Sequence, residues 1–448
     1  MNAHITNPAE RFPQLLDEIQ AVAAEATSFS NSSELRDFEN RVTQLAFDLV
    51  GVMVAMKIQQ AIDSDQTRRQ AAERVNASAK KLRHQGRRPF TIRLRGGVTI
   101  QVWANYYSRS SSPRTNAKHG LYPELAVLGI ICHHTPAAVE QISKLVALAS
   151  SMREAQELLR ERGYDLSINV IRRLVYRVSA LVRAAQSQGR AKISGSVAGK
   201  TVVVSIDGGR VRIRADMKKK TKKKRKRYSA NWREPKLLII YVADAEGKID
   251  RSFPPVIDGT LGGPDQAFEL LRFYLQQLDV QNADRVLFVA DGAQWIWHRV
   301  KTLFASVKIA ADRCHMLVDF YHAFEYLGKI AESKKEWKPS ERKQWLKTQR
   351  KRLLRGEVGT VCEEIAKVIG NRPTKDQKRW LNYFKRNALN NRRMDYACAT
   401  ANHLPIGSGA MESAIRRIVN LRLKGPSIFW HEQNAQAILL QRAWHKTG

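Results

Sequence analysis

Between residues 200 and 312 the chain alternates short apolar runs with longer amphipathic stretches. The stretches 263–278 and 292–304 carry the helical period. The apolar runs, rich in Val, Ile and Leu, predict buried strands at 201–207, 235–244, 248–258, 285–291 and 306–312. The third strand is expected to end at Pro254 and Pro255, because proline cannot donate to a strand ladder. Three strands, helix, strand, helix and strand predict an α/β core with a mixed sheet.

Residues 35–56 repeat apolar side chains at alternating spacings of three and four, which is typical of a coiled-coil seam. The seam would consist of Leu35, Phe38, Val42, Leu45, Leu49, Val52 and Met56. Two interpretations are open: self-association through this helix, or an amphipathic helix packed on its own domain, which Gly51 inside the run favours. Residues 1–88 are expected to form a helical N-terminal region in either case.

A β-hairpin is predicted next, within residues 89–134. The runs FTIRLR at 90–95 and VTIQVW at 98–103 flank Gly96 and Gly97. A two-glycine loop permits the positive φ values that a tight hairpin turn requires. A linker is expected to fill the rest of this region.

Residues 135–190 predict three helices in a helix-turn-helix-like arrangement. Thr135 followed by Pro136 marks the start of the first, and Ser167 caps the third. The polar face of the third helix carries Asn169, Arg172, Arg173, Tyr176 and Arg177, types that reach bases and phosphates from the major groove. Reading of DNA through Arg172, Arg173 and Arg177 is one interpretation, and an ordinary helical connector is the other.

The composition indicates a polyanionic partner. The chain has 448 residues, with 76 Lys and Arg against 42 Asp and Glu, a formal net charge of +34. Such a field attracts nucleic acid or anionic membrane alike, so it sets a class of partner and no chemistry. No run approaches the roughly 20 apolar residues that cross a bilayer, and no secretory signal is evident. We therefore expect a cytoplasmic protein without membrane partners.

The strongest charge cluster is KKKTKKKRKR, with nine basic residues among positions 218–227. Self-repulsion predicts an extended loop, either a phosphate-binding arm or a solvated loop without a specific role. The basic residues are Lys218, Lys219, Lys220, Lys222, Lys223, Lys224, Arg225, Lys226 and Arg227.

Three acidic residues are placed where metal ligands are expected. Asp207 ends TVVVSID, Asp291 ends VLFVAD, and Glu412 lies in PIGSGAMES after a Gly-Ser-Gly turn. Two strand-end aspartates and a helix-borne glutamate can hold two divalent cations, and oxygen ligands favour Mg²⁺ or Mn²⁺. The plainer alternatives are Asp-Gly turns and a helical Glu412–Arg416 ion pair. The four cysteines are isolated from one another and suggest neither a disulfide framework nor a zinc site.

Five motifs in one order resemble the DDE transposases of bacterial insertion sequences of the Kra type, in the mutator-like branch of the RNase H-like superfamily. They are VSIDGGRVRIR, WREPKLLIIYV, VADGAQWIW, VDFYHAFEYL and PIGSGAMESAIRRIVNLRLKGPSIFW. By this resemblance, which spans about 200–445, Asp207, Asp291 and Glu412 form the catalytic triad. Asp319 and His322 fall on a D-x-x-H motif. The chain departs from the family pattern after the early hairpin, where many relatives carry cysteines and this chain reads YYSRSSSPRTNAKHG.

The resemblance implies an RNase H-like core of the retroviral integrase type at 200–315, a helical insertion at 316–400, and C-terminal helices at 401–448. It implies two Mg²⁺ or Mn²⁺ ions, cleavage and strand transfer of terminal-repeat and target DNA, and a homodimer or higher oligomer on DNA in the bacterial nucleoid. Arg416, Arg417 and Lys424 would follow Glu412 along the DNA. Trp295, Trp297 and Trp430 could stack on unpaired bases, although core packing is expected for at least two.

Two other functions are open: a domesticated DNA-binding protein without activity, and a structure-specific or RNA nuclease on the same core. The intact acidic residues argue against the first. The upstream helical module, which favours double-stranded DNA, argues against the second.

Overall fold

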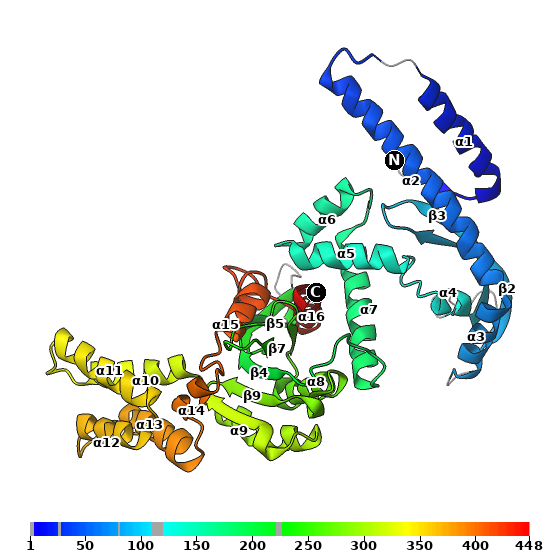
Figure 1. Ribbon diagram of the computed structural model, residues 1–448. Helices are drawn as coiled ribbons and strands as arrows, with labels where there is room; N and C mark the ends of the chain where they lie inside the picture. The colour runs from blue at the N-terminus through cyan, green and yellow to red at the C-terminus, as the bar shows by residue number, and fades with distance from the viewer. Residues whose placement is uncertain (1–3, 26–27, 79–80, 109–119, 221–225, 448) are drawn as a thin grey trace. The chain divides into compact units, whose positions relative to one another are not determined.

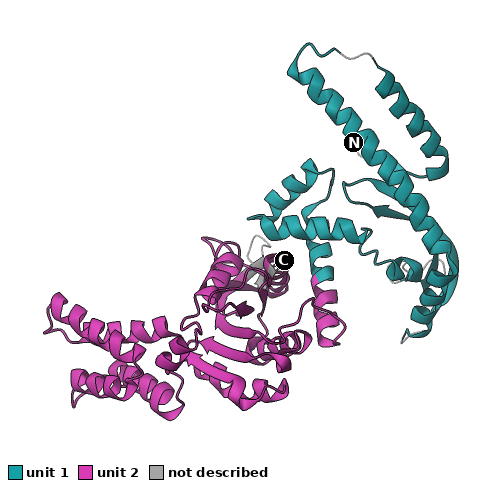
Figure 2. Cartoon of the chain, viewed as in Figure 1, with its two compact units in different colours: residues 1–178 teal, residues 179–448 magenta. Residues whose placement is uncertain are grey.

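The computed structural model describes residues 4–25, 28–78, 81–108, 120–220 and 226–447. The chain forms two compact units, Met1–Val178 and Ser179–Gly448 (Figures 1 and 2). The division falls inside helix α7, Ile168–Ser187.

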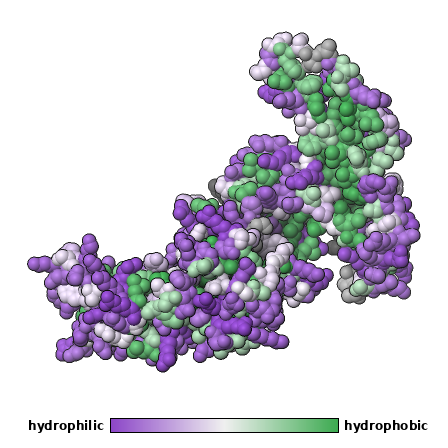
Figure 3. All heavy atoms as spheres, viewed as in Figure 1, coloured by the Kyte–Doolittle hydropathy of each residue, from purple (hydrophilic) through white to green (hydrophobic). Residues whose placement is uncertain are grey.

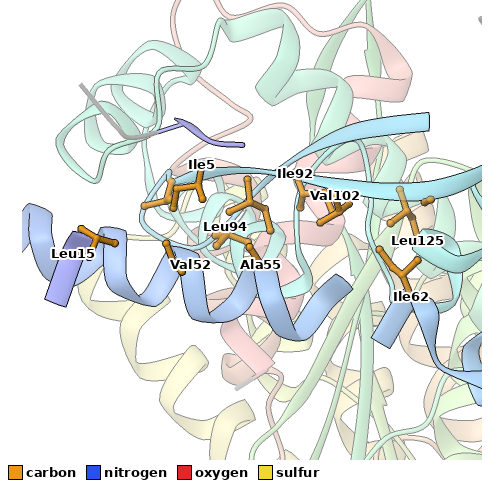
Figure 4. Packing of buried hydrophobic residues seen from close by; sticks show 12 residues of the cluster. Ile5, Leu15, Val52, Ala55, Ile62, Ile92, Leu94, Val102 and Leu125 are labelled. Atoms are coloured by element: carbon orange, nitrogen blue, oxygen red, sulfur yellow. The ribbon is translucent and has the colours of Figure 1, made fainter. Parts of the chain in front are cut away.

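Unit 1 begins with helices packed on a small sheet. Helices α1 (Pro8–Ala24) and α2 (Ser32–Asp63) contact each other, and α3 (Asp65–Asn76) follows. The sheet has the order β1-β3-β2, with strands β1 (His4–Ile5), β2 (Arg83–Arg93) and β3 (Thr99–Ser108). Its buried face meets Val52 and Ala55 of α2 (Figure 4).

The predicted hairpin is confirmed by the pairing of β2 with β3. Gly96 and Gly97 have φ values of 83° and 85°, which side chains with a Cβ rarely adopt. Strand β2 begins at Arg83, inside the region expected to be helical. The glycines lie in the turn as expected, but the register is not that of a two-residue loop, because Arg93 pairs with Thr99 and three residues, 95–97, connect Leu94 to Val98. The strand also extends further back than the apolar pattern indicated.

Helices α4 (Pro123–Val127), α5 (Pro136–Leu148), α6 (Met152–Glu161) and α7 complete this part of the chain. The Thr135 hydroxyl caps α5 by accepting a hydrogen bond from the backbone N–H of Ala138. The three helices after residue 135 therefore occur as the sequence predicts.

Unit 2 is built on a five-stranded mixed sheet with the order β10-β9-β4-β7-β8. Strand β4 (Thr201–Gly208) pairs antiparallel with β7 (Lys236–Ala243), which pairs antiparallel with β8 (Val256–Thr260). On its other side β4 lies parallel to β9 (Arg285–Ala290), and β9 lies parallel to β10 (Cys314–Val318). Strand β7 is buried along its whole length, as expected for the centre of a sheet covered on both faces.

Two strand predictions were wrong. The third strand begins after Pro254 and Pro255 instead of ending there, because the proline pair fits an approach to the ladder better than a place within it. The segment 306–312 is not a strand: α9 ends at Ser306 and a 3-10 turn, Ala311–Arg313, follows. The fifth strand is Cys314–Val318, so residues 316–318 belong to the sheet and not to the helical insertion.

Helices cover the sheet. Helix α8 (Gly263–Gln277) packs on β7 and β8 and contacts α9 (Gln294–Ser306). A 3-10 turn at Val280–Asn282 leads to β9. The C-terminal helix α16 (Glu432–Thr447) packs on β8. The end of α7 is tied to the same strand, because the Arg183 guanidinium donates to both carboxylate oxygens of buried Asp258, at 2.6 and 2.8 Å.

The helical insertion consists of α10 (Phe320–Ser333), α11 (Pro339–Leu354), α12 (Val358–Ile369), α13 (Lys375–Phe384) and α14 (Tyr396–Ala401). A π-helical turn, Lys385–Asn390, extends α13. In Figure 1 these helices form a lobe at one end of unit 2. Helix α15 (Gly409–Ile415) and a π-helical turn, Arg416–Asn420, return to the sheet, where α15 contacts β4 and β7.

Candidate functional site

Three aspartates lie at one edge of the unit 2 sheet. Asp207 is near the end of β4, Asp291 follows β9 and Asp319 follows β10. These three strands are parallel neighbours, so their carboxyl ends meet at the same edge. A hydrogen bond of 2.8 Å from the Asp319 N–H to the Ala290 carbonyl ties two of the strand ends together. We call the ends of β4, β9 and β10 the acidic edge.

Asp207 and Asp291 lie close enough to repel each other. Burial raises the pKa of Asp207, and the negative charge of Asp291 raises it further, to about 6 despite a hydrogen bond from the Gly208 N–H. Asp291 accepts a 3.0 Å hydrogen bond from the Ala293 N–H. Among the described residues neither carboxylate forms an ion pair with Lys or Arg. This pair of oxygen donors fits a divalent cation, which would relieve the repulsion.

Asp319 has a different role, because it is fully buried and fully bonded. Its Oδ1 accepts a 2.8 Å hydrogen bond from the His322 N–H, and its Oδ2 accepts from both the N–H and the hydroxyl of Ser408. Burial alone would raise the pKa of Asp319, but the His322 side chain, together with these bonds, outweighs it and lowers the pKa to about 2. Asp319 thereby holds the loop before α15 against the acidic edge.

His322 provides a positive charge beside the edge. Its Nδ1 lies 3.4 Å from Oδ1 of Asp319. This carboxylate raises the pKa of His322 to about 9 against the opposing effect of burial, with smaller contributions from Glu325 and Asp291. The imidazolium therefore persists at neutral pH and also lowers the energy of ionised Asp207. The D-x-x-H motif is thus an ion pair in this fold.

Glu412 lies in the first turn of α15, the helix that packs on β4 and β7, with its side chain exposed. Within the described part of the chain, no three His, Cys, Asp or Glu side chains are gathered as they would be around a metal ion. The structure therefore brings Asp207 and Asp291 together and does not bring Glu412 to them. No Glu412–Arg416 ion pair occurs among the described residues either, so the plainer alternative for this glutamate has no support.

The basic run lies in a β-hairpin inserted between β4 and β7. Its strands are β5 (Val211–Lys220) and β6 (Lys226–Arg233). The expectation of an extended loop is wrong for Lys218, Lys219, Lys220, Lys226 and Arg227, whose backbones belong to paired strands. The apolar positions Val211 and Ile213, which pack inward, allow the pairing to extend into the charged run. Residues 221–225, with Lys222, Lys223, Lys224 and Arg225, lie outside the described residues.

The other predicted DNA-contact residues are distributed over two regions. On α7, Arg173 and Arg177 are exposed, whereas Arg172 is half-buried and donates to Asn169. After α15, Arg416 and Lys424 are exposed, and Arg417 is half-buried with its Nε donating to the Ser413 carbonyl. The structure gives each of these side chains access to solvent.

The three tryptophans singled out in the sequence are held by the protein. Trp297 is buried and donates to the Asp291 carbonyl, and Trp430 donates to the Leu423 carbonyl. Trp295 is half-buried under the Lys236 ammonium, which lies 4.0 Å from the ring centroid. Ser408, which sequence reasoning missed, is the partner that gives Asp319 its role. Its only signal in the sequence is the position between two glycines in PIGSGAMES.

Comparison with known proteins gives a distant likeness. No family model matches this chain, and no curated protein matches it. Among solved structures, the chain is similar to the Drosophila P element transposase strand transfer complex, at 12% sequence identity and a TM-score of 0.21. The likeness covers 68% of this chain and 78% of that chain. So distant a likeness defines neither the fold nor the chemistry, which follow from this chain's own strands and side chains.

Proposed function

We propose that this chain is a metal-dependent DDE transposase with an RNase H-like core. The observation that carries the proposal is the pairing of Asp207 and Asp291 at the ends of adjacent parallel strands, without a Lys or Arg ion pair among the described residues. The order and directions of the five strands support it, because three antiparallel strands followed by two parallel ones are what the RNase H-like pattern predicts.

Asp207 and Asp291 would hold Mg²⁺ or Mn²⁺, and Glu412 would complete the set when α15 moves toward them. Two such ions stabilise the attacking and leaving oxygens of an in-line displacement at a phosphodiester. Ionised Asp207 is the form that binds a cation, so affinity should fall as the pH drops below about 6. The reaction class is hydrolysis at the element end, followed by attack of the 3′-hydroxyl on target DNA.

Asp319 and His322 would act as positioning residues. Asp319 fixes Ser408, which directly precedes α15, so it determines where the Glu412 helix starts. His322 holds its positive charge beside the two aspartates. The insertion lobe would also help to position Asp291, because Arg386 donates to the carbonyl of the next residue, Gly292, at 3.1 Å.

Sequence-specific and general DNA contacts would lie on different elements. Exposed Arg173 and Arg177 on α7 suit base contacts, each worth on the order of 1 to 3 kcal/mol of discrimination, with Arg172 beside them. The basic hairpin and Arg416, Arg417 and Lys424 suit phosphate contacts. Replacing Arg173 should lower the preference for terminal-repeat over random duplex. Neutralising 218–227 should weaken binding to both and flatten its salt dependence, measured by anisotropy at several salt concentrations.

The exposed face of α2 would join two copies of the chain. Apolar side chains gather along α2 (Figure 3), among them exposed Leu35, Val42, Val50 and Met53. Leu35 and Val42 belong to the predicted coiled-coil seam, whereas Val52 of the same seam is buried in unit 1. We place the oligomer on DNA in the bacterial cytoplasm.

Helix α2 also corrects a sequence expectation. By length and composition it is apolar enough to cross a membrane, the one such helix among the described residues. The sequence pattern did not indicate this apolar stretch because a few charged residues interrupt it. This criterion is also met by helices of proteins that never enter a bilayer, and a second copy of the chain would cover the same side chains.

The test of the proposed function is Mg²⁺-dependent cleavage of DNA flanking the gene of this protein. Asp207→Asn, Asp291→Asn and Glu412→Gln should each abolish cleavage and leave DNA affinity unchanged or slightly raised, because only negative charge is lost. Asp312→Asn is the matched control, since the sequence pattern also placed it at a strand end, but the structure leaves it exposed after α9. Substantial cleavage by any triad variant would remove that residue from the site.

A further inference from the structure

The hairpin between β4 and β7 has two different faces. Val211 and Ile213 point inward and are buried. Residues directly opposite on paired strands share a face, and the register pairs Arg212 with Trp232 and Arg214 with Ala230, two residues from Tyr228. Because side chains alternate along a strand, Arg214 lies on this second face as well. We call Arg212, Arg214, Tyr228 and Trp232 the aromatic–arginine face.

Both aromatic rings of this face remain open to solvent. Tyr228 is 45% exposed and Trp232 is 57% exposed. These values contrast with Trp297, which is buried in the core, and Trp430, which is held by a backbone carbonyl. Rings of this size are enriched where a partner covers them, so their exposure on a basic hairpin calls for a planar, electron-rich or apolar partner.

Each of the two arginines is held against aromatic rings and by a hydrogen bond. The Arg212 guanidinium carbon lies 5.6 Å from the Trp232 ring centroid and 4.6 Å from that of Phe429, and Arg212 also donates to the Gly425 carbonyl. Arg214 lies 5.4 Å from the Tyr228 ring centroid and hydrogen-bonds to His431. The C-terminal segment therefore orders the guanidinium planes, while the rings keep an open side.

The hairpin also rises directly from the acidic edge. Gly208, next to Asp207, pairs with Lys236, and the Gly209 N–H donates to the Pro235 carbonyl at 3.0 Å. Strand β5 begins at Val211, so Arg212 is less than roughly 20 Å along the chain from Asp207 at about 3.3 Å per residue. A DNA strand held at the acidic edge would reach this face within a few nucleotides.

We propose that the aromatic–arginine face binds unpaired bases of the DNA strand next to the phosphate that is cut. Every base has a π-face, so rings and guanidinium planes bind single-stranded nucleic acid with little sequence preference. In an intact duplex those π-faces are covered by neighbouring bases, and the partner is therefore a frayed or displaced strand. The positive charge of the hairpin complements the backbone that connects these bases. The inference rests on the proposed function for its choice of DNA as the substrate.

The test measures binding without cleavage. The full-length protein, in EDTA, is titrated onto a labelled duplex with a short unpaired end and onto the same duplex fully paired. The wild-type protein should prefer the unpaired end. Trp232→Ala and Tyr228→Ala should each weaken binding to it by about tenfold, as expected for loss of one stacked ring, and change binding to the paired duplex by less than twofold.

Matched variants separate stacking from folding and from general charge. Trp103→Ala removes a ring of 47% exposure from the other unit and should leave both affinities unchanged. Trp232→Phe should restore most of the preference, because it restores a ring. Equal losses on both duplexes, or no loss on the unpaired end, would overturn the assignment of this face.

The outcome can be separated from that of the cleavage test. If Asp207→Asn abolishes cleavage but Trp232→Ala prefers unpaired ends as the wild-type protein does, the inference about this face fails alone. If the wild-type protein never cleaves DNA but its preference depends on Trp232, the face is a binding site and the proposed catalysis fails.

Discussion

The acidic edge of unit 2 and helix α2 of unit 1 both present groups that a partner would stabilise. The groups are carboxylates at the edge and apolar side chains on α2. At the edge, Asp207 and Asp291 repel each other, and neither forms an ion pair with Lys or Arg among the described residues. On α2, Val50 and Met53 are each 53% exposed, although Val52 is buried. The first region needs positive charge and the second needs an apolar cover. Binding at the edge should therefore depend on cations and pH, and binding at α2 on protein concentration.

At the acidic edge, the largest loss of stability is expected from Asp319→Asn. The amide nitrogen cannot accept from Ser408, so the loop before α15 would lose its attachment and leave a buried N–H unpaired. Stability should fall by about 2 to 3 kcal/mol, and cleavage by about 10- to 100-fold, which is usual for groups that orient metal ligands. Thermal unfolding and single-turnover cleavage measure the two effects.

Ser408→Ala is the graded control for this change. It removes one of the two bonds from Ser408 and keeps the backbone N–H, so both losses should be smaller. The attachment role would be wrong if Asp319→Asn left cleavage intact in protein that is still folded.

The next effect is a pH-dependent gain in stability for Asp207→Asn. Burial in the folded protein raises the pKa of Asp207 from its ordinary value of 3.8 to about 6. The wild-type protein therefore pays little penalty below pH 4, a growing one between about pH 4 and 6, and the full one above pH 6. Removing the charge should stabilise the protein by about 3 kcal/mol at pH 7.5 and by about 0.5 kcal/mol at pH 4. Denaturant unfolding at both pH values gives the difference.

A cation should act on the same repulsion. Adding Mg²⁺ at pH 7.5 should raise the melting temperature of the wild-type protein and leave that of Asp207→Asn nearly unchanged, since only the native site binds it. Equal shifts in melting temperature for both proteins would mean that Mg²⁺ binds elsewhere. The acidic edge would then not be the cation site.

The smallest effect on stability is expected on α2. Replacing Val50 and Met53 together by Glu should change the unfolding free energy of the monomer by about 0.5 kcal/mol or less, because both positions are exposed. Self-association should nevertheless be lost in sedimentation velocity experiments. Val52→Glu is the contrasting variant, since a buried charge there should unfold unit 1. A wild-type protein that stays monomeric at all concentrations would refute the dimer.

The sequence predicted the parts of the fold in which one signal dominates. Strands β4, β7 and β9 are nearly continuous apolar runs, so their positions and the strand-end aspartates followed from the pattern. The edge strand β10 contains Cys314, His315 and Met316 and lacks that signature. The apolar segment before it, 306–312, instead follows directly from the end of helix α9.

The assembly of the site was less accessible from the sequence. The strand ends placed Asp207 and Asp291 side by side, but the bond between Asp319 and Ser408 joins segments separated by the whole insertion lobe. The exposed rings of β6 were also missed, because a tryptophan in a strand gives no sign of which face it occupies until the register is known.

The most direct measurement is the anomalous scattering of Mn²⁺ in crystals of the protein bound to DNA with terminal-repeat ends. We predict Mn²⁺ between the carboxylates of Asp207 and Asp291, with Glu412 brought to the same ions by a movement of α15. Mn²⁺ bound away from both aspartates, or Glu412 facing solvent on the opposite side of the sheet in a DNA-bound complex, would contradict the proposed active site.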